Sequence, residues 1–376
     1  MKIILFANTD WYLYNFRLSL SKALRSKGHE VILVSPPGRY GKLLEREGFT
    51  WIAIKMNRRS LNPWGEIQTI LRLVSLYKRQ APDIVHHFTI KCVIYGSIAA
   101  TFARVPSKIN AVTGLGYIFT SDCLYAKILR IIVKIILRFV LSGKKTILIL
   151  QNPDDVKIFL KNKLIAPKKV KLIRGSGVDI NRYRPKFRCK KENFQVLLAT
   201  RLLWDKGIRE YVEAAKILKA EDKKVDFLMA GSIDRGNPDS ISQEKINKWE
   251  ENGFIIPLGH VDKMEELLAK VDIVTLPTTY GEGVPKILLE AAACGLPIVA
   301  TDVPGCREIV SNGENGFLVP PKNPEALANA IRLLIDDENR CMTMGREGRK
   351  KILAEFDERI IIKQTLDVYK EIMPEF

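Results

Sequence analysis

Two glutamates, Glu282 and Glu290, are spaced so that both could contact one elongated ligand. Glu282 precedes a predicted helix over 286–294, and Glu290 lies within it. Eight helical residues rise about 12 Å and return the second side chain nearly to the first face. The start of the helix offers N–H groups and a positive dipole end, which attract anions. The spacing fits a sugar, a diphosphate and a ribose in line; the alternative is an ordinary crossover helix with two surface glutamates.

Two cations, Arg201 and Lys206, follow a predicted strand over 194–199. Arginine can bind a diphosphate through two parallel hydrogen bonds, and lysine can bind it as a point charge. Open parallel sheets bind ligands at the carboxyl ends of their strands. The pair could therefore clamp a diphosphate; the alternative is two ordinary surface cations.

Alternating strands and helices are expected to position these residues. A β-branched strand over 271–276 leads through a loop over 278–283 to a helix between Pro285 and Gly295. Proline suits the first turn of a helix, and glycine suits the residue after its end. The first half alternates in the same way, beginning with a strand over 1–7. The pattern predicts the α/β class with doubly wound parallel sheets.

The first half offers candidates of its own. His86 and His87 end a predicted strand, where a ligand role competes with a structural role in the core. Thr113 and Gly114 end another predicted strand. Glycine there would let the backbone approach a ligand closely, although a plain tight turn needs it as well.

A predicted helix over 127–140 is both apolar and basic, and its cations recur at steps of three, four and four: Lys127, Arg130, Lys134 and Arg138. This composition is typical of a helix lying in a membrane interface. The alternative is a core-packed helix with one solvated basic stripe. Arg58 and Arg59 would extend the basic surface.

Charge is distributed unevenly along the 376 residues. Residues 1–185 hold 32 Lys and Arg against 10 Asp and Glu, whereas residues 186–376 hold 28 against 32. The first half therefore suits an acidic membrane face, a polyphosphorylated lipid or a nucleic acid. Six scattered cysteines without a CxxC pair predict a reducing cytoplasm, with neither a zinc site nor a disulfide framework. We expect no signal peptide and no membrane-spanning helix.

A set of short motifs runs along the second half: Arg201…Lys206-Gly207, Leu258-Gly259-His260-Val261, Glu282-Gly283-Val284-Pro285, Glu290-Ala291, Gly295-Leu296-Pro297-Ile298-Val299-Ala300 and Asn315-Gly316. In combination the chain resembles family 4 retaining glycosyltransferases, which have the GT-B fold of two Rossmann-like domains facing across a cleft. The first half is similar more loosely, through residues 83–87 and 112–116. The chain looks most like the bacterial enzymes, including the PglA-type N-acetylgalactosaminyltransferases, that extend undecaprenyl-diphosphate-linked oligosaccharides.

This resemblance implies a role for each matching position. Glu282 would hold the hydroxyls of the donor sugar and stabilise developing positive charge, and Glu290 would hold the ribose hydroxyls. Arg201 and Lys206 would neutralise the leaving diphosphate. The other implied donor contacts are the amides of Gly283 and Val284, the backbone of Gly259 and His260 at the base, and the loop of Thr113 and Gly114.

The chain departs from many relatives at two places. Asn8-Thr9-Asp10 stands where many relatives carry Gly-Gly, and Thr113 stands where many carry a histidine at the donor sugar. The second departure leaves open which group holds the 6-position of the sugar, and therefore which sugar is donated.

We expect a Rossmann-like domain on the acceptor and membrane side over 1–185, a donor-binding domain over 186–355, and a helix over 356–376 that packs back on the first. The expected activity is retaining transfer of a hexose or N-acetylhexosamine from a UDP-sugar to a polyprenyl-diphosphate-linked saccharide, in surface polysaccharide or glycoprotein glycan assembly. No Asp-x-Asp motif occurs, in agreement with a clamp that needs no metal or other cofactor. The expected location is peripheral, on the anionic inner face of the cytoplasmic membrane.

Two alternatives remain. One is a UDP-sugar 2-epimerase on the same fold, which the basic helix and the Arg201 and Lys206 pattern disfavour. The other is a non-catalytic protein that binds membranes or polyanions such as nucleic acid, whose affinity would fall steeply with salt and which would turn over no donor. We expect no nucleic-acid partner.

Overall fold

The computed structural model of the chain describes residues 1–57, 62–115, 119, 123–186, 192–234 and 237–376. The described chain divides into two compact units. Unit 1 comprises Met1–Ser176 and Arg359–Phe376, and unit 2 comprises Gly177–Glu358.

Continuous apolar runs such as Ile3–Phe6 form the sheet of unit 1, because strands covered by helices on both faces need apolar side chains on both. Its seven strands are parallel, in the order β3-β2-β1-β4-β5-β6-β7. The strands are β1 (Lys2–Phe6), β2 (Glu30–Ser35), β3 (Thr50–Ala53), β4 (Ile84–Phe88), β5 (Ser107–Val112), β6 (Thr146–Leu150) and β7 (Val170–Leu172).

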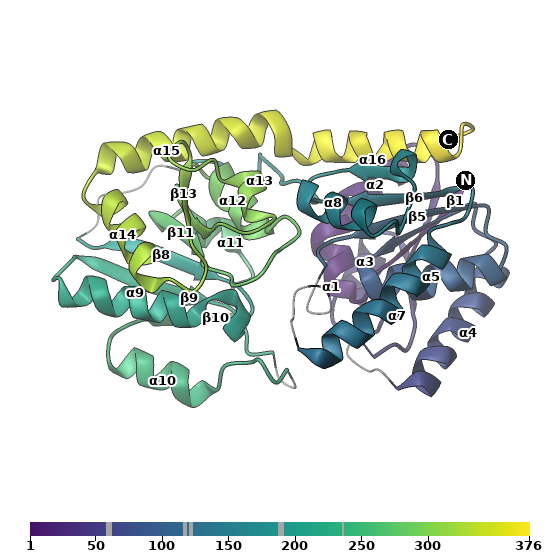
Figure 1. Cartoon of the computed structure of the whole chain (residues 1–376). Helices are drawn as coiled ribbons and strands as arrows, with labels where there is room; N and C mark the ends of the chain where they lie inside the picture. The colour runs from purple at the N-terminus through teal and green to yellow at the C-terminus, as the bar shows by residue number, and fades with distance from the viewer. Residues whose placement is uncertain (58–61, 116–118, 120–122, 187–191, 235–236) are drawn as a thin grey trace. The chain divides into compact units, whose positions relative to one another are not determined.

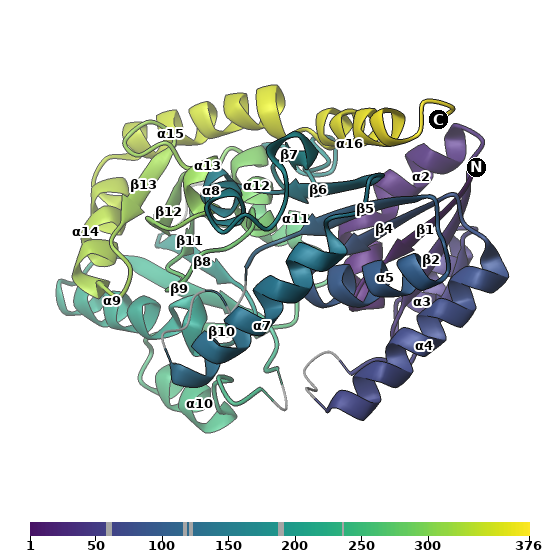
Figure 2. The same cartoon turned by 45° about the vertical axis from the view of Figure 1, so that its right-hand side comes forward.

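Two sets of helices bury the two faces of this sheet (Figures 1 and 2). One face packs against α1 (Asp10–Tyr12), the π-helical turn η1 (Leu13–Arg17), α2 (Leu18–Ser26), α3 (Gly41–Arg46) and α16 (Glu358–Ile372). The other face packs against α4 (Pro63–Gln80), α5 (Ile90–Phe102), α7 (Leu124–Val140) and α8 (Pro153–Lys161). A short 3-10 turn, η2 (Pro167–Lys169), precedes β7.

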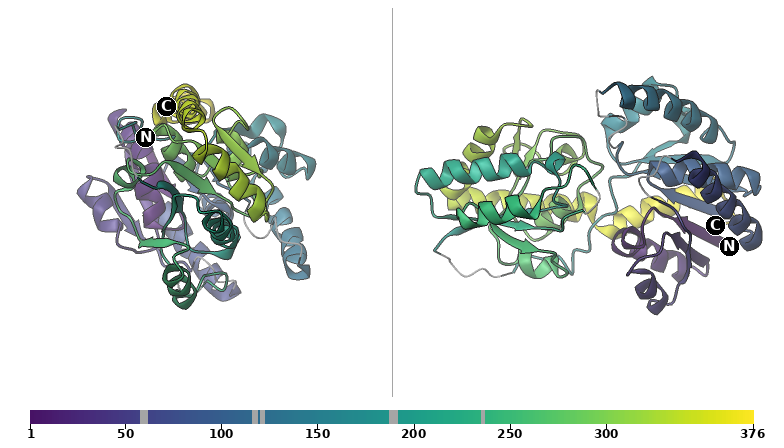
Figure 3. Two further views of the ribbon diagram at one scale, coloured as in Figure 1. Left: turned by 90° about the vertical axis from the view of Figure 1, so that its left-hand side faces the viewer. Right: turned by 90° about the horizontal axis from the view of Figure 1, so that it is seen from below.

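Unit 2 repeats the scheme with six parallel strands in the order β10-β9-β8-β11-β12-β13. They are β8 (Phe194–Ala199), β9 (Val225–Ala230), β10 (Ile256–Gly259), β11 (Ile273–Leu276), β12 (Ile298–Thr301) and β13 (Gly316–Val319). The helical segments are η3 (Trp204–Lys206), α9 (Ile208–Ala220), α10 (Gln243–Glu251), α11 (Met264–Leu268), α12 (Lys286–Ala293), α13 (Cys306–Ile309), α14 (Pro324–Ile335), α15 (Glu338–Lys351) and η4 (Ile352–Phe356). The views of Figures 1 and 3 show α9 beside α14, and α12 beside α15.

The predicted class of two parallel-sheet, Rossmann-like domains is confirmed. The unit boundaries lie at 176/177 and 358/359, whereas the sequence places them at 185/186 and 355/356. The first difference has a physical reason, because the segment after Gly177 packs into unit 2. The N–H of Val178 donates to the carbonyl of Phe356 at 3.0 Å, and the N–H of Glu358 donates to the carbonyl of Val178 at 3.1 Å.

Candidate functional site

The candidate site of unit 2 lies where β8 and its neighbour β11 end. The chain leaves β8 toward β9 and β10, and then returns to β11 on the other side of β8. The direction of strand addition therefore reverses between β8 and β11, and open sheets bind ligands outside the carboxyl ends of strands at such a point. Lys206 in η3 follows β8, and Glu282 follows β11.

Lys206, which is buried, and Glu282, which is half-buried, form an ion pair at this point. The Lys206 Nζ donates to Glu282 Oε1 and to the hydroxyl of Tyr280 at 3.0 Å, and it lies 4.6 Å from the centre of the Tyr280 ring. Burial by itself would lower the pKa of Lys206, but the charge of Glu282 outweighs it and the pKa is raised. The ammonium therefore stays charged in a largely dehydrated place.

Further contacts hold the side chain and the backbone of Glu282. Thr278 Oγ1 lies 3.3 Å from Glu282 Oε1, and the backbone N–H of Glu282 donates to the carbonyl of Pro304 at 3.0 Å. Gly305 has φ +87°, and a Cβ on it would overlap the carbonyl oxygen of Gly283. Only glycine fits there, so the loop after β12 presses directly on the backbone that carries the glutamate.

The loop carrying Lys206 is fixed in the same manner. Gly207 has φ +76°, and a Cβ there would overlap the carbonyl oxygen of Pro277. The carbonyl of Asp205 accepts from the Thr279 N–H at 2.9 Å and from its hydroxyl at 3.1 Å. The loops after β8 and β11 are thus tied backbone to backbone, which sets lysine and glutamate in register before any ligand arrives.

Arg201, the other cation of the predicted clamp, also follows β8 and contacts Asp234. Its side chain is 46% exposed, and its Nη1 lies 3.3 Å from Asp234 Oδ2. Such a half-exposed pair contributes little stability, so Arg201 can exchange Asp234 for another anion at low cost.

Glu290 is buried on α12, so the alternative of two surface glutamates is wrong for this residue. Burial raises the pKa of its carboxyl, and Lys286, 3.9 Å away, opposes the rise, as does the hydroxyl of Tyr183. Buried glutamates are rare unless paired. The backbone of Gly283 and Val284 leads into this helix, whose N-cap residue, Pro285, offers no side-chain cap.

Gly259 ends β10 and His260 follows it, at the same edge of the sheet as the Lys206–Glu282 pair. The carbonyl of Gly259 accepts from the N–H of Gly231 at 2.8 Å, and His260 Nε2 lies 3.1 Å from Asp262 Oδ1. Their predicted contact with a nucleotide base stays a prediction.

Sequence reasoning missed three neighbours of the predicted residues. Tyr280 and Thr278 contact the Lys206–Glu282 pair, and Tyr183 contacts Glu290. Tyr280 lies two residues before Glu282. An aromatic hydroxyl so close to a candidate carboxylate is a usable signal. Tyr183 is distant in sequence and gave none.

In unit 1 the acceptor role predicted for His86 and His87 stays a prediction. Both are buried in the sheet. His87 Nδ1 lies 2.8 Å from Asn110 Oδ1 and its Nε2 lies 3.2 Å from the Tyr77 hydroxyl, while His86 Nδ1 lies 2.8 Å from the Tyr369 hydroxyl. Burial lowers the pKa of His87 to about 4 and that of His86 well below its usual value. These are neutral core residues.

Thr113 and Gly114 follow β5 in unit 1, and both are half-buried. Gly114 has φ +124°, a conformation that other residues rarely adopt. Their predicted contact with the donor sugar stays a prediction.

Two cations of the basic stripe of α7 have hydrogen-bond partners within unit 1. Lys134 Nζ donates to Asn162 Oδ1 at 2.7 Å, and Arg138 donates to the carbonyls of Asn162 at 3.0 Å and Lys163 at 3.2 Å. These two cations therefore cap the end of α8, where carbonyls carry the negative end of the helix dipole. Lys127 is exposed and Arg130 half-buried. Arg58 and Arg59 lie outside the described residues.

Apolar side chains, not cations, dominate the exposed face of α7. They are Ile128, Ile131, Ile132, Ile135 and Phe139, which we call the α7 stripe. A second helix of unit 1 exposes the α4 stripe of Trp64, Ile67 and Leu71. Both sets follow helical spacing, so each forms one continuous apolar face.

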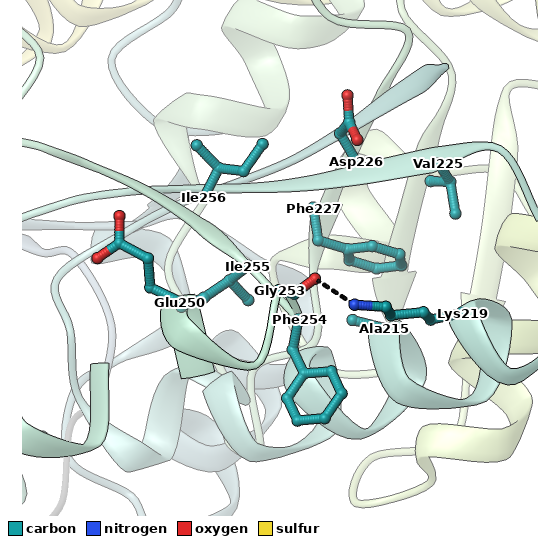
Figure 4. A pocket seen from close by; sticks show the side chains of 10 residues that line it. All are labelled: Ala215, Lys219, Val225, Asp226, Phe227, Glu250, Gly253, Phe254, Ile255 and Ile256. Carbon is teal, nitrogen blue, oxygen red and sulfur yellow. Dashed lines mark hydrogen bonds between the residues drawn. The ribbon is translucent and has the colours of Figure 1, made fainter. Parts of the chain in front are cut away.

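A hollow of about 300 Å³ between α9, α10 and β9 is a separate feature of unit 2 (Figure 4). Phe227 and Phe254 line it, and Val225 and Asp226 place it toward the amino end of β9, away from the Lys206–Glu282 pair. The Lys219 Nζ in its wall donates to the carbonyls of Asn252 and Gly253. The Lys219 ammonium is therefore already hydrogen-bonded to carbonyls that follow the end of α10.

Three further expectations concern the described residues only. Within them, no helix combines the length and apolar character needed to cross a membrane. In the same segments no three His, Cys, Asp or Glu side chains gather as a metal ion would require. The cysteines described are free thiols, and Cys189 lies outside the described residues.

Comparison with known proteins follows the division into two units. Residues 2–152 match the family model for glycosyl transferase 4-like proteins, and residues 179–351 match that for glycosyl transferases group 1. The chain is 29% identical to the N,N'-diacetylbacillosaminyl-diphospho-undecaprenol alpha-1,3-N-acetylgalactosaminyltransferase of Campylobacter jejuni, with 99% of each chain covered. It is 28% identical to the capsular polysaccharide biosynthesis glycosyltransferase CapM of Staphylococcus aureus, covering 94% of this chain and 92% of the relative.

Solved structures share the fold at lower identity. A glycosyltransferase from Rickettsia africae superposes with a TM-score of 0.79 at 21% identity, over 100% of this chain and 99% of that one. The Anabaena protein HepE, in complex with UDP-glucose, superposes with a TM-score of 0.78 at 21% identity, over 99% and 100%.

Proposed function

We propose that this chain, which belongs to the group 1 and 4-like glycosyltransferases of GT-B fold, moves a hexose or N-acetylhexosamine from a UDP-sugar to a polyprenyl-diphosphate-linked saccharide with retention. The observation that carries the proposal is the ion pair of buried Lys206 and half-buried Glu282 at the strand-order reversal of unit 2. The names of the Campylobacter and Staphylococcus relatives support the acceptor class and surface polysaccharide or glycan assembly.

The cations at this edge would act on the leaving group. Lys206 exchanges the Glu282 carboxylate for a phosphate oxygen of the donor, and Arg201 turns from Asp234 to the same diphosphate. Positive charge fixed where negative charge develops lowers the barrier without reorganising solvent. We propose that these two cations suffice for the diphosphate, so that no metal ion is needed.

The carboxylates would act on hydroxyls and on positive charge. Released by Lys206, Glu282 accepts hydrogen bonds from the donor sugar and stabilises the positive charge that grows on it as the bond to the diphosphate breaks. Glu290 accepts hydrogen bonds from the ribose hydroxyls, and the backbone N–H groups of Gly283 and Val284 add donors toward the diphosphate. In this proposal the backbone of Gly259 and His260 contacts the base, and Thr113 and Gly114 contact the donor sugar.

The acceptor side would use unit 1. The α7 stripe and the α4 stripe are exposed apolar faces, and Lys127 lies exposed beside the first. An apolar helical face with nearby cations binds an anionic lipid surface by burying area and by charge attraction. We propose a peripheral position on the inner face of the cytoplasmic membrane, where a lipid-linked acceptor is found.

A donor panel tests the function. The purified chain, with EDTA and no added metal, is offered UDP-GalNAc, UDP-GlcNAc, UDP-Gal and UDP-Glc together with short polyprenyl-diphosphate sugars. We expect transfer from one donor, unaffected by EDTA. Release of UDP from none of them, with salt-sensitive binding to vesicles or nucleic acid, would favour the non-catalytic alternative. Interconversion of UDP-GlcNAc and UDP-ManNAc without an acceptor would favour the epimerase.

A further inference from the structure

Arg17 carries a buried charge that no carboxylate of the described chain neutralises. Its side chain is 6% exposed, and its guanidinium carbon lies 4.4 Å from the centre of the Phe88 ring and 5.4 Å from that of Tyr12. Its side-chain hydrogen bonds go to the Tyr12 hydroxyl, 2.7 Å from Nη2 and 3.3 Å from Nε. Among the residues described, it forms no ion pair. A buried cation normally has an anionic partner, and the described residues supply none for Arg17.

A π-helical turn makes this arrangement. In an α-helix, residues five apart point about 140° away from each other. The turn η1 (Leu13–Arg17) widens the helix, and Tyr12 and Arg17 come to share one side. Such insertions are frequent at functional sites. The Tyr12 hydroxyl accepts from the guanidinium, so its own proton remains available for a second acceptor.

Neighbouring polar groups do not compensate the charge. The carboxylate of Asp10 accepts from the backbone N–H groups of Trp11 at 2.8 Å, Tyr40 at 2.7 Å and Gly41 at 2.9 Å. His86 also lies close, with its ring centre 4.1 Å from that of Phe88, and its buried Nε2 has no hydrogen-bond partner. The Asp10 carboxylate is therefore already hydrogen-bonded to backbone N–H groups. The His86 imidazole carries no negative charge that could pair with Arg17.

The place of Arg17 in the sheet indicates a ligand site. Strand order in unit 1 reverses between β1 and β4, as it does between β8 and β11 in unit 2. Phe88 is the last residue of β4, and Tyr12 lies in the first helical turn after β1. The guanidinium thus lies at the carboxyl ends of the two strands that flank the reversal, where open parallel sheets bind ligands. In the same turn the Trp11 side chain is 43% exposed, so this edge reaches solvent.

We propose that Arg17 and Tyr12 form an anion-binding subsite of unit 1 that takes the diphosphate of the lipid-linked acceptor, an inference that rests on the function proposed above. The guanidinium fork and the tyrosine proton supply donors for phosphate oxygens. The shared chemistry is a diphosphate, which both the acceptor and the leaving UDP carry. The test therefore keeps the UDP site occupied.

Binding of inorganic pyrophosphate to the full chain, measured by titration calorimetry in saturating UDP, tests the subsite. We expect Arg17→Met to weaken binding roughly tenfold to a hundredfold, as for a lost charged hydrogen bond. Arg17→Lys should lose less, since it keeps the charge without the fork. Arg25→Met is the matched control, because Arg25 also stacks on a phenylalanine, 4.2 Å from the Phe49 ring, but is exposed. Unchanged binding in Arg17→Met, or an equal loss in Arg25→Met, would overturn the proposal.

Tyr12→Phe keeps the test decisive if Arg17→Met does not fold, because it removes only the hydroxyl. It should weaken pyrophosphate binding severalfold and raise the acceptor KM while kcat changes little. An unaltered pyrophosphate affinity and acceptor KM in a folded Tyr12→Phe would count against the subsite.

The two proposals fail separately. Sugar transfer with a normal acceptor KM in Arg17→Met would overturn the subsite and leave the function standing. Pyrophosphate binding that depends on Arg17, in a chain that transfers no sugar to any acceptor, would support the subsite and overturn the function.

Discussion

The two units have the same reversal of strand order and fill its edge with different chemistry. In unit 2 the cations Lys206 and Arg201 face the carboxylates of Glu282 and Asp234. In unit 1 the cation Arg17 faces aromatic rings and a hydroxyl. A ligand with both hydroxyls and phosphates needs acceptors and cations together, whereas an anionic group alone needs only donors. The fold provides the edge twice, and the side chains decide what it binds.

The surfaces of the units differ as well. Most of the exposed large apolar side chains described in unit 1 gather in the α7 and α4 stripes, and Trp11, Phe102 and Leu172 lie outside them. Those of unit 2, such as Ile256 on β10 and Leu333 on α14, lie on separate elements. Scattered apolar residues are normal on any surface, but continuous faces mark contact with a partner or a membrane.

Glu282→Gln should have the largest effect on turnover. It removes the carboxylate charge at the strand-order reversal of unit 2, and this charge is what distinguishes that edge from the Arg17 edge of unit 1. Glutamine keeps the size and can still accept from Lys206, but it cannot stabilise positive charge. We expect turnover to fall about 100- to 1000-fold, with UDP affinity retained, as measured by steady-state transfer and calorimetry. Glu250→Gln on α10 is the control. Equal losses of turnover and UDP affinity would leave Glu282 only a binding role.

Glu290→Gln tests whether the Glu290 carboxylate of unit 2 binds the nucleotide. Loss of a charged acceptor for ribose hydroxyls should weaken UDP binding about tenfold or somewhat more. Since burial raises the pKa of Glu290, the wild-type affinity should begin to fall on acidification above the usual glutamate range. The variant should lack that acid limb in calorimetric titrations at several pH values. An acid limb that persists in Glu290→Gln would assign it to another group.

Ile135→Ser tests the surface difference. Its side chain is 63% exposed, and transfer of half of it into lipid is worth about 1 kcal/mol, or roughly fivefold in affinity. Co-sedimentation with phosphatidylglycerol vesicles should show that loss, with little change in thermal stability. Leu333→Ser, 47% exposed in unit 2, should bind vesicles as wild type does. Similar losses from both variants would contradict a membrane face confined to unit 1.

Asp155→Asn changes the pH dependence of stability and not activity or binding, and it concerns unit 1 alone. Burial raises the pKa of this carboxyl to about 7, against the opposing hydrogen bond from Asn152. The folded state therefore holds a proton that the unfolded state has released, and stability falls as pH rises toward and through 7. Wild type should lose about 1.4 kcal/mol between pH 6 and pH 8 from this group. The amide of the variant cannot titrate. The free energy of unfolding of the variant minus that of wild type, measured with denaturant, should therefore increase from pH 6 to pH 8. A difference that stays constant would refute the prediction.

Local signals explain why much of unit 2 could be predicted. The predicted strand over 271–276 and helix over 286–294 correspond to β11 (Ile273–Leu276) and α12 (Lys286–Ala293). A β-branched run, Pro285 and Gly295 carry that information within a few residues. Lys206 and Glu282 are each predicted as site residues, but their pairing is not; it arises because the adjacent parallel strands β8 and β11 bring their following loops together.

Signals that depend on tertiary packing could not be obtained from the sequence. His86 and His87 end a strand as ligand residues do, but their partners Tyr369 and Asn110 come from elsewhere in the chain. The helix α7 has two apolar faces, and periodicity does not tell which one packs. The π-helical turn at Leu13–Arg17 changes which residues share a side, so Tyr12 and Arg17 escape an analysis based on a period of 3.6.

The division of the chain has a consequence for biosynthesis. Unit 2 is one continuous stretch, whereas unit 1 needs Arg359–Phe376, whose Tyr369 hydroxyl bonds His86 in the middle of the sheet. During translation from the N-terminus, all of unit 2 emerges before the segment that completes unit 1. The unit encoded first is therefore the last to mature. Unit 1, with its apolar stripes and half-built core, is the part that needs protection from aggregation while the ribosome finishes the chain.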